Sequence, residues 1–292
     1  MNHIEAIFAA AAPHRRLIIP YICAGDPDAA TSGAILNALH EAGAEIAEVG
    51  MPFSDPVADG RSIQTATQRA LQGGMSMNGV FELCANAERA PAAILFGYLN
   101  PIARYGLERF AQDAGRAGVR GAIIADLPYE EAPPVRPVLH RAGIGLTLLI
   151  APSTPPDRAA RIAEVSDGFV YVVSRLGVTG ASREPDFEGL ATQLQTLRAR
   201  TGSYIAAGFG ISSAEHVRAI APYADAMVVG SALVDAIAGR IGIQAAEAAR
   251  TFMRPLIDAA RRPFAGSGDY GIDQRSSTSS MVKVGSRSTI AS

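Results

Sequence analysis

The chain has 292 residues, a formal net charge of −2, 48% hydrophobic residues and 18% charged residues. Its length suits either two average domains or one α/β barrel, since single barrels of roughly 250 residues are common. The near-neutral charge provides no basic field that would attract nucleic acid or an anionic membrane, so neither is expected as a partner.

Cysteine usage and the N-terminal segment indicate where the protein works. The two cysteines, Cys23 and Cys84, have no CxxC or zinc-type spacing, which argues against a disulfide framework or a structural metal. The segment Met1–Ala12 carries Glu5 and is typical of a short amphipathic helix, not of a secretion signal. No later segment is apolar enough to predict a membrane span. We therefore expect a soluble, cytoplasmic protein.

Short apolar runs bounded by Gly, Pro and Asp recur along the chain and predict buried parallel strands. There are eight of them: Leu17–Cys23, Glu45–Gly50, Ala92–Gly97, Gly121–Asp126, Ile144–Ile150, Gly168–Ser174, Ser203–Gly208 and Asp225–Gly230. Segments with helical spacing lie between them, for example Ala29–Ala42, Leu107–Ala117, Glu130–Arg141, Phe187–Arg200 and Ser213–Ile220.

An uninterrupted series of strand-plus-helix units predicts a closed (β/α)8 TIM barrel of the α/β class, with an open doubly wound sheet as the alternative. We expect one catalytic domain over residues 1–264. From about Ala265 the composition turns to Gly, Ser, Thr and Arg, so residues 265–292 are expected to be a disordered tail. In a barrel of this kind, the chemistry belongs on the loops that follow the strands.

Glu48 and Asp59 are the candidate acid/base residues. Glu48 lies inside a predicted strand, where burial raises the pKa of a carboxyl group toward neutrality. Its structural alternative is a carboxylate paired with an arginine. Asp59 follows in the loop Asp55–Gly60, which can fold back over the barrel mouth, and its alternative is a helix N-cap or a turn residue.

Glycines after three successive strands predict a phosphate site. They occur in Gly177–Gly180, Gly208–Ser212 and Gly230–Ala232, where main-chain N–H groups and helix starts can approach an anion. Tyr21, Tyr98 and Tyr171 could line an aromatic substrate's pocket, although each could equally fill the barrel core.

The residues available also limit the chemistry. Cleaving a carbon–carbon bond commonly needs an electron sink, either a Schiff-base lysine or a metal ion. The only lysine is Lys283, in the predicted tail, and no histidine falls at the carboxyl end of a predicted strand. The substrate itself must then accept the electrons.

Several segments together resemble one family. From Glu48 the chain reads EVGMPFSDPVADGRSIQTATQRAL, which resembles the signature of the tryptophan synthase alpha chain family. The likeness extends to about Arg262 and includes the segments Ile19–Pro27, Gly97–Ile102, Ala125–Pro128, Tyr171–Gly180 and Gly208–Ile211.

This resemblance implies a role for each matching residue. Glu48 and Asp59 match the family's catalytic carboxylates. The implied phosphate site comprises Gly180, Gly210, Gly230 and Ser231, and the implied lining of the indole and glycerol pocket comprises Tyr21, Phe96, Ala125, Tyr171, Thr179 and Phe209. Thr179 would belong to a loop that closes over the substrate and contacts the aspartate.

The resemblance also implies the reaction and the partner. The reaction is the retro-aldol cleavage of indole-3-glycerol phosphate to indole and glyceraldehyde 3-phosphate in L-tryptophan biosynthesis. This chain needs no cofactor or metal, and the partner is a beta chain that carries pyridoxal phosphate in an alpha2-beta2 complex. Arg61, where the family usually has proline, and Cys23, where it usually has threonine, depart from the pattern.

Three other functions remain open from the sequence. A stand-alone indole-3-glycerol phosphate lyase would share every catalytic residue and work without a beta chain. A sugar-phosphate isomerase would use the same glycines and two carboxylates. A non-catalytic barrel would only bind and activate a partner.

Overall fold

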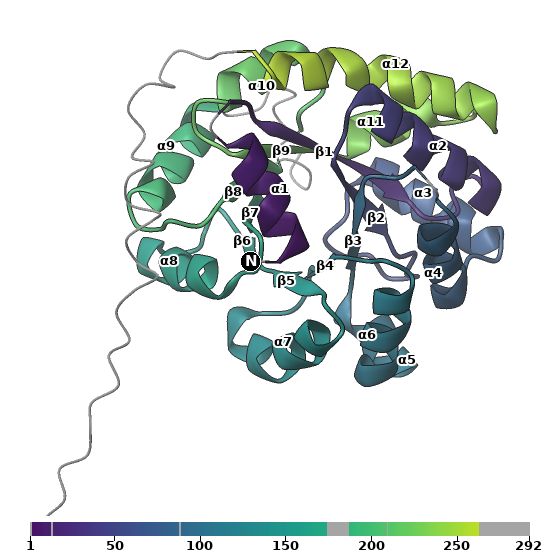
Figure 1. Cartoon of the computed structure of the whole chain (residues 1–292), viewed down its shortest axis with the longest axis horizontal. Coiled ribbons are helices and arrows are strands. Elements are labelled where there is room, and N and C mark those ends of the chain that lie inside the picture. Colours follow the sequence, from purple (N-terminus) through teal and green to yellow (C-terminus); the bar gives the residue numbers. More distant parts are fainter. Residues whose placement is uncertain (1, 13, 88, 174–186, 209, 263–292) are drawn as a thin grey trace, which may run out of the picture.

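Parallel strands form a nearly closed barrel in the computed structural model (Figure 1). The structure describes residues 2–12, 14–87, 89–173, 187–208 and 210–262. The strands pair in the order β5-β4-β3-β2-β1-β9-β8-β7-β6. Their bounds are β1 Leu17–Cys23, β2 Ile46–Gly50, β3 Ala92–Gly97, β4 Gly121–Ile124, β5 Gly145–Thr147, β6 Leu149–Ile150, β7 Val170–Val173, β8 Ile205–Gly208 and β9 Ala226–Val229.

The predicted strand Ile144–Ile150 is divided at Leu148, which explains why nine strands are found where eight were expected. The Leu148 N–H donates to the Ser166 hydroxyl at 2.9 Å rather than to a neighbouring strand. β5 pairs with β4, and β6 pairs with β7. The two ends of the sheet are thus consecutive pieces of one strand, so the TIM-barrel prediction is confirmed and the open sheet is wrong.

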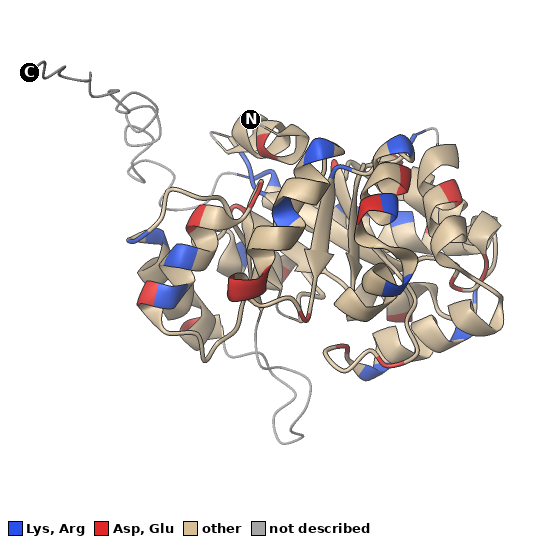
Figure 2. Cartoon of the chain, turned by 90° about the horizontal axis from the view of Figure 1, so that it is seen from below, with Lys and Arg blue, Asp and Glu red and all other residues tan. Residues whose placement is uncertain are grey.

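Helices surround the barrel (Figure 1). Their bounds are α1 His3–Ala11, α2 Ala29–Ala42, α3 Arg61–Gln72, α4 Met77–Asn86, α5 Leu99–Tyr105, α6 Leu107–Arg116, the 3-10 turn η1 Tyr129–Glu131, α7 Ala132–Arg141, α8 Pro156–Val165, α9 Phe187–Arg198, α10 Ala214–Ile220, α11 Ser231–Ile237 and α12 Ile243–Ala260. Basic and acidic residues are interspersed along them (Figure 2). Among the described residues, no helix combines the length and the apolar character that crossing a bilayer requires.

The alternation of side chains along each strand separates two apolar layers. In β2, Ala47 and Val49 belong to the layer between the strands and the outer helices, whereas Ile46 belongs to the cluster inside the barrel. The same inner cluster takes one face of the other strands, with Ile19, Ile94, Ile123, Ala206 and Val228 among its members. Glu48, two residues after Ile46, therefore points into the barrel.

The N-terminal helix α1 closes the amino end of the barrel. Asn2 caps it, accepting a hydrogen bond from the Glu5 N–H at 2.7 Å, while the Glu5 side chain accepts one from the Asn2 N–H. Phe8 is buried against the inner cluster, with its ring 5.2 Å from that of Phe169. Helix α1 thus packs on the inner cluster at the amino ends of the strands.

Candidate active site

Glu48 is buried inside the barrel without an ion-pair partner among the described residues. Its exposed fraction is 1%, and its Oε1 atom has no hydrogen-bond partner in the described structure. Burial raises the pKa of this carboxyl group from 4.5 to about 8, because the charged form loses its hydration. No described arginine supports the alternative of a structural ion pair, and a buried carboxyl group with a raised pKa and an oxygen without a hydrogen-bond partner is typical of an active site.

Two buried tyrosines flank Glu48. Tyr21 is its register partner in β1, and Tyr171 projects from β7 into the same interior. Burial raises the pKa of both hydroxyl groups, and the nearby carboxylates Glu48 and Asp59 raise it further. Both phenols therefore stay neutral, and both lie close to the two carboxyl groups.

Two glycines leave the space that these tyrosine rings occupy. A Cβ atom on Gly50 would lie 2.1 Å from the Tyr21 hydroxyl oxygen, and one on Gly208 would lie 2.3 Å from the Tyr171 ring. The sequence interpretation assigned no role to Gly50 and read Gly208 only as part of a phosphate loop. Only the placement of the rings reveals why no side chain fits there.

Asp59 lies in the loop between β2 and α3, and Tyr98 holds that loop at the end of β3. The Tyr98 hydroxyl accepts a hydrogen bond from the Ala58 N–H at 3.0 Å, and its ring packs 5.5 Å from that of Phe53. Burial raises the pKa of Asp59 from 3.8 to about 6, and a hydrogen bond from Tyr98 acts in the opposite direction. The N-cap of α3 is Gly60, without a side-chain cap, so Asp59 is not the N-cap residue.

Three residues of the predicted phosphate site are described, and one of them, Ser231, lies beside this loop. Gly210 follows β8 with a positive φ of 49°, and Gly230 precedes α11, whose first residue is Ser231. A Cβ atom on Gly60 would lie 3.8 Å from the Ser231 hydroxyl oxygen, so the start of α11 adjoins the loop that carries Asp59. The first N–H groups of a helix have no partner within it and are available to an anion.

The remaining predicted site residues divide into two groups. Phe96 in β3 forms an edge-to-face contact with Tyr21 at 5.8 Å, and Ala125 follows β4, its N–H donating to the Gly97 carbonyl at 2.8 Å. Both lie at the carboxyl ends of their strands. Thr179, Gly180 and Phe209 lie outside the described residues.

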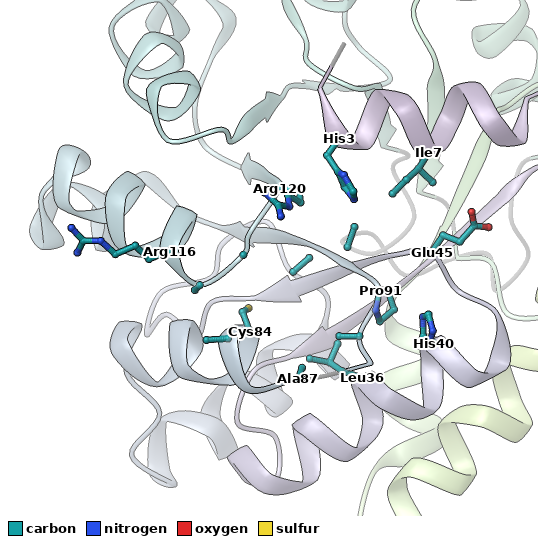
Figure 3. Close-up of a pocket in the computed structure, with 16 residues that line it drawn as sticks. His3, Ile7, Leu36, His40, Glu45, Cys84, Ala87, Pro91, Arg116 and Arg120 are labelled. Atoms are coloured by element: carbon teal, nitrogen blue, oxygen red, sulfur yellow. The ribbon is translucent and has the colours of Figure 1, made fainter.

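A cavity of about 520 Å³ lies at the opposite end of the barrel and contains none of the predicted site residues (Figure 3). It is bordered by His3 of α1, His40 of α2, Glu45 before β2 and Arg120 before β4. The Glu45 carboxylate is paired with Arg15 at 2.6 Å. Within the described ranges, no three His, Cys, Asp or Glu side chains gather in a way that could hold a metal ion. Glu48 and Asp59 therefore lie away from this cavity.

Comparison with known proteins agrees with this geometry. The family model described as tryptophan synthase alpha chain matches residues 8–261. The chain belongs to the tryptophan synthase alpha chain family. It is 45% identical over 256 residues to the tryptophan synthase alpha chain of Phenylobacterium zucineum, covering 86% of this chain and 92% of that one. It is 41% identical over 267 residues to that of Chloroflexus aggregans, covering 90% and 99%.

Solved structures of the family have the same architecture. A Mycobacterium tuberculosis tryptophan synthase structure superposes with a TM-score of 0.81 at 33% identity, covering 90% of this chain and 99% of that one. The alpha chain from Legionella pneumophila gives a TM-score of 0.78 at 31% identity, covering 89% and 97%. The resemblance predicted from the sequence is confirmed, and the tryptophan synthase alpha family is favoured over a stand-alone lyase.

Proposed function

We propose that this chain, as a tryptophan synthase alpha subunit, cleaves indole-3-glycerol phosphate to indole and glyceraldehyde 3-phosphate. The observation that carries the proposal is the buried, incompletely bonded Glu48 carboxyl group, which shares the carboxyl end of the barrel with Asp59 and two neutral tyrosines. We assign the substrate from the family to which the chain belongs.

Glu48 acts as the acid and then as the base. Because its pKa is raised to about 8, it is mostly protonated at neutral pH and can donate its proton to indole C3. The resulting ionised carboxylate then takes the proton of the side-chain hydroxyl group next to C3. As that O–H bond breaks, the C=O bond of the aldehyde forms, the carbon–carbon bond to C3 breaks, and its electron pair returns to the ring. Glu48 is protonated again at the end.

Asp59 has the complementary task. Its pKa of about 6 leaves it mostly ionised at neutral pH, where Glu48 is protonated. Its carboxylate accepts a hydrogen bond from the indole N–H and stabilises the positive charge that develops on the protonated ring. Two carboxyl groups with separated pKa values provide the acid and the electrostatic partner in one pocket.

The other residues of the site bind and orient the substrate. We assign the phosphate group to Gly210, Gly230 and Ser231, together with Gly180, and the aromatic ring to the pocket bordered by Tyr21, Phe96, Ala125, Tyr171, Thr179 and Phe209. The protonated indole ring is the electron sink, so the reaction needs no cofactor in this chain. The side chains from β1, β3 and β7 converge on the same interior as Glu48.

We further propose that the partner is a beta chain carrying pyridoxal phosphate, in an alpha2-beta2 complex in the cytoplasm. Membership of the tryptophan synthase alpha chain family supports this partner.

Indole release from indole-3-glycerol phosphate tests the proposal, measured with and without added beta chain. Glu48→Gln is expected to abolish indole formation while leaving substrate binding measurable, since the amide cannot transfer a proton. A Glu48→Gln variant with most of its activity would refute the mechanism. A high rate that the beta chain leaves unchanged would refute the subunit assignment, and wild-type protein without indole release would favour a non-catalytic barrel or an isomerase.

A further inference from the structure

Helix α3 follows Asp59 directly, yet it has a weak apolar attachment to the rest of the barrel. Its buried residues are the small side chains Ala66, Thr67 and Ala70. It packs mainly against β1 and α11. Its first residue, Arg61, is exposed and stands at the positive end of the helix dipole, where a cation is unfavourable. Ile63 of α3 is also partly buried against the cluster that contains Ala66 and Ala70, so apolar burial helps to hold the helix, but mostly through small side chains.

One side chain on the last turn of α3 makes the strong attachment. The Arg69 guanidinium group donates two hydrogen bonds to the Asp26 carboxylate, Nε to Oδ1 at 2.7 Å and Nη2 to Oδ2 at 2.8 Å. Asp26, in the loop after β1, is only 4% exposed. A bidentate pair of this kind restrains both the distance and the orientation of the two groups.

The acceptor side of this pair is itself held in place. The Ser32 hydroxyl of α2 accepts a hydrogen bond from the Gly25 N–H at 3.0 Å and donates one to the Asp26 carbonyl at 3.4 Å. The hydrogen bonds that Arg69 donates to Asp26, together with the negative charge of Asp26, hold the pKa of Arg69 above its usual range, and Asp235 of α11 contributes in the same direction. Arg69 thus joins α3 to the β1–α2 loop and faces the helix that begins the phosphate site.

We propose that Arg69, through its two hydrogen bonds to Asp26, is a positioning residue that sets the placement of Asp59 by clamping α3 to the loop after β1. The proposal rests on the proposed function for its kinetic consequences. Its structural consequence, a restrained α3, does not depend on any activity.

The chain offers a closely matched control pair at the other end of the barrel. Arg136 of α7 donates two hydrogen bonds to Asp167, at 2.7 Å and 3.1 Å. The exposed fraction of the arginine side chain is 36% in both pairs, and the carboxylates are 4% and 10% exposed. Asp167 precedes β7, so this pair lies at the amino ends of the strands, away from Asp59.

The experiment compares Arg69→Met, Arg69→Lys and Arg136→Met in the indole-release assay, well below each melting temperature. Displacing a catalytic group by about 1 Å can cost about a hundredfold in rate, so we expect Arg69→Met to lower kcat at least about tenfold. KM should change by less than about threefold, because the glycines assigned to the phosphate lie outside α3. Arg69→Lys retains the positive charge but cannot make the two parallel hydrogen bonds of a guanidinium group, so its kcat should lie between those of Arg69→Met and wild type. Arg136→Met should lower the melting temperature but leave kcat near the wild-type value.

Hydrogen exchange of the α3 amides, residues 61–72, provides a readout without substrate. Exchange should accelerate in Arg69→Met and not in Arg136→Met. Equal kcat losses in both methionine variants, or unchanged α3 exchange in Arg69→Met, would overturn the proposal. If Arg69→Met does not fold, an Arg69→Lys variant with wild-type kcat and exchange would overturn it equally. Wild-type protein that releases no indole would refute the proposed function and leave the exchange test standing.

Discussion

Replacing Glu48 by glutamine should stabilise the protein as the pH rises, although it removes the group that we propose as the catalytic acid. Burial raises the pKa of Glu48 from 4.5 to about 8, so folding favours the protonated form. The free energy of unfolding of the wild type therefore decreases with rising pH. The cost of ionising Glu48 in the folded protein is absent below the pKa of the unfolded chain, grows between the two pKa values and is complete above the pKa of the folded protein. Wild-type stability therefore falls across this range, whereas a glutamine has no proton to lose.

The size of the effect follows from the same shift. One pKa unit corresponds to about 1.4 kcal/mol, so the full penalty is about 5 kcal/mol, and the part that develops between about pH 5 and pH 8.5 is about 4 kcal/mol. Any packing cost of the amide is the same at every pH and cancels in the comparison. A gain of this kind is typical where function requires a buried, unsatisfied group.

Urea unfolding of wild type and Glu48→Gln at pH 5, 7 and 8.5, followed by circular dichroism, measures this difference. Glu82→Gln is the control, because Glu82 is exposed on α4 and its replacement removes the same carboxyl group from the surface. The reasoning is refuted if the stability difference between Glu48→Gln and wild type stays constant within about 1 kcal/mol over this range.

Two further substitutions test the contacts around the site. Tyr98→Phe removes the hydrogen bond that lowers the pKa of Asp59, so that pKa should rise above about 6. The acid limb of the pH–activity profile should then move to higher pH. An unchanged acid limb would contradict a hydrogen bond between Tyr98 and a functional Asp59. Gly50→Ala places a Cβ atom 2.1 Å from the Tyr21 hydroxyl oxygen and should lower the free energy of unfolding by about 1–3 kcal/mol, measured by thermal unfolding. Gly202→Ala is the control, because a Cβ atom there has no neighbour within 4 Å and should be nearly neutral. Equal effects would show that the Tyr21 ring moves to make room for the Cβ atom.

The order of elements and the candidate acid and base could be predicted from the sequence because both depend on local patterns. Apolar runs of strand length alternate with helical spacing, and this alternation predicts a parallel α/β fold, for which the uninterrupted series favours a barrel over an open sheet. The position of Glu48 two residues after Ile46 places both on one face of a strand, whatever the strand packs against. The strand ends were less predictable: Glu45 lies before β2, and Leu148 interrupts the fifth predicted strand.

Other features arise only when distant segments meet. Nothing near Asp26 in the chain indicates that Arg69 binds it, since 43 residues separate them and the pair exists because α3 returns to β1. The need for glycine at position 50 depends likewise on where the Tyr21 ring lies. The sequence by itself thus determined the barrel and its candidate acid and base, because periodicity and residue type are local properties. The tertiary structure alone decided how those groups are buried, shifted in pKa and held in place, because burial and hydrogen bonding depend on contacts between strands and helices far apart in the chain.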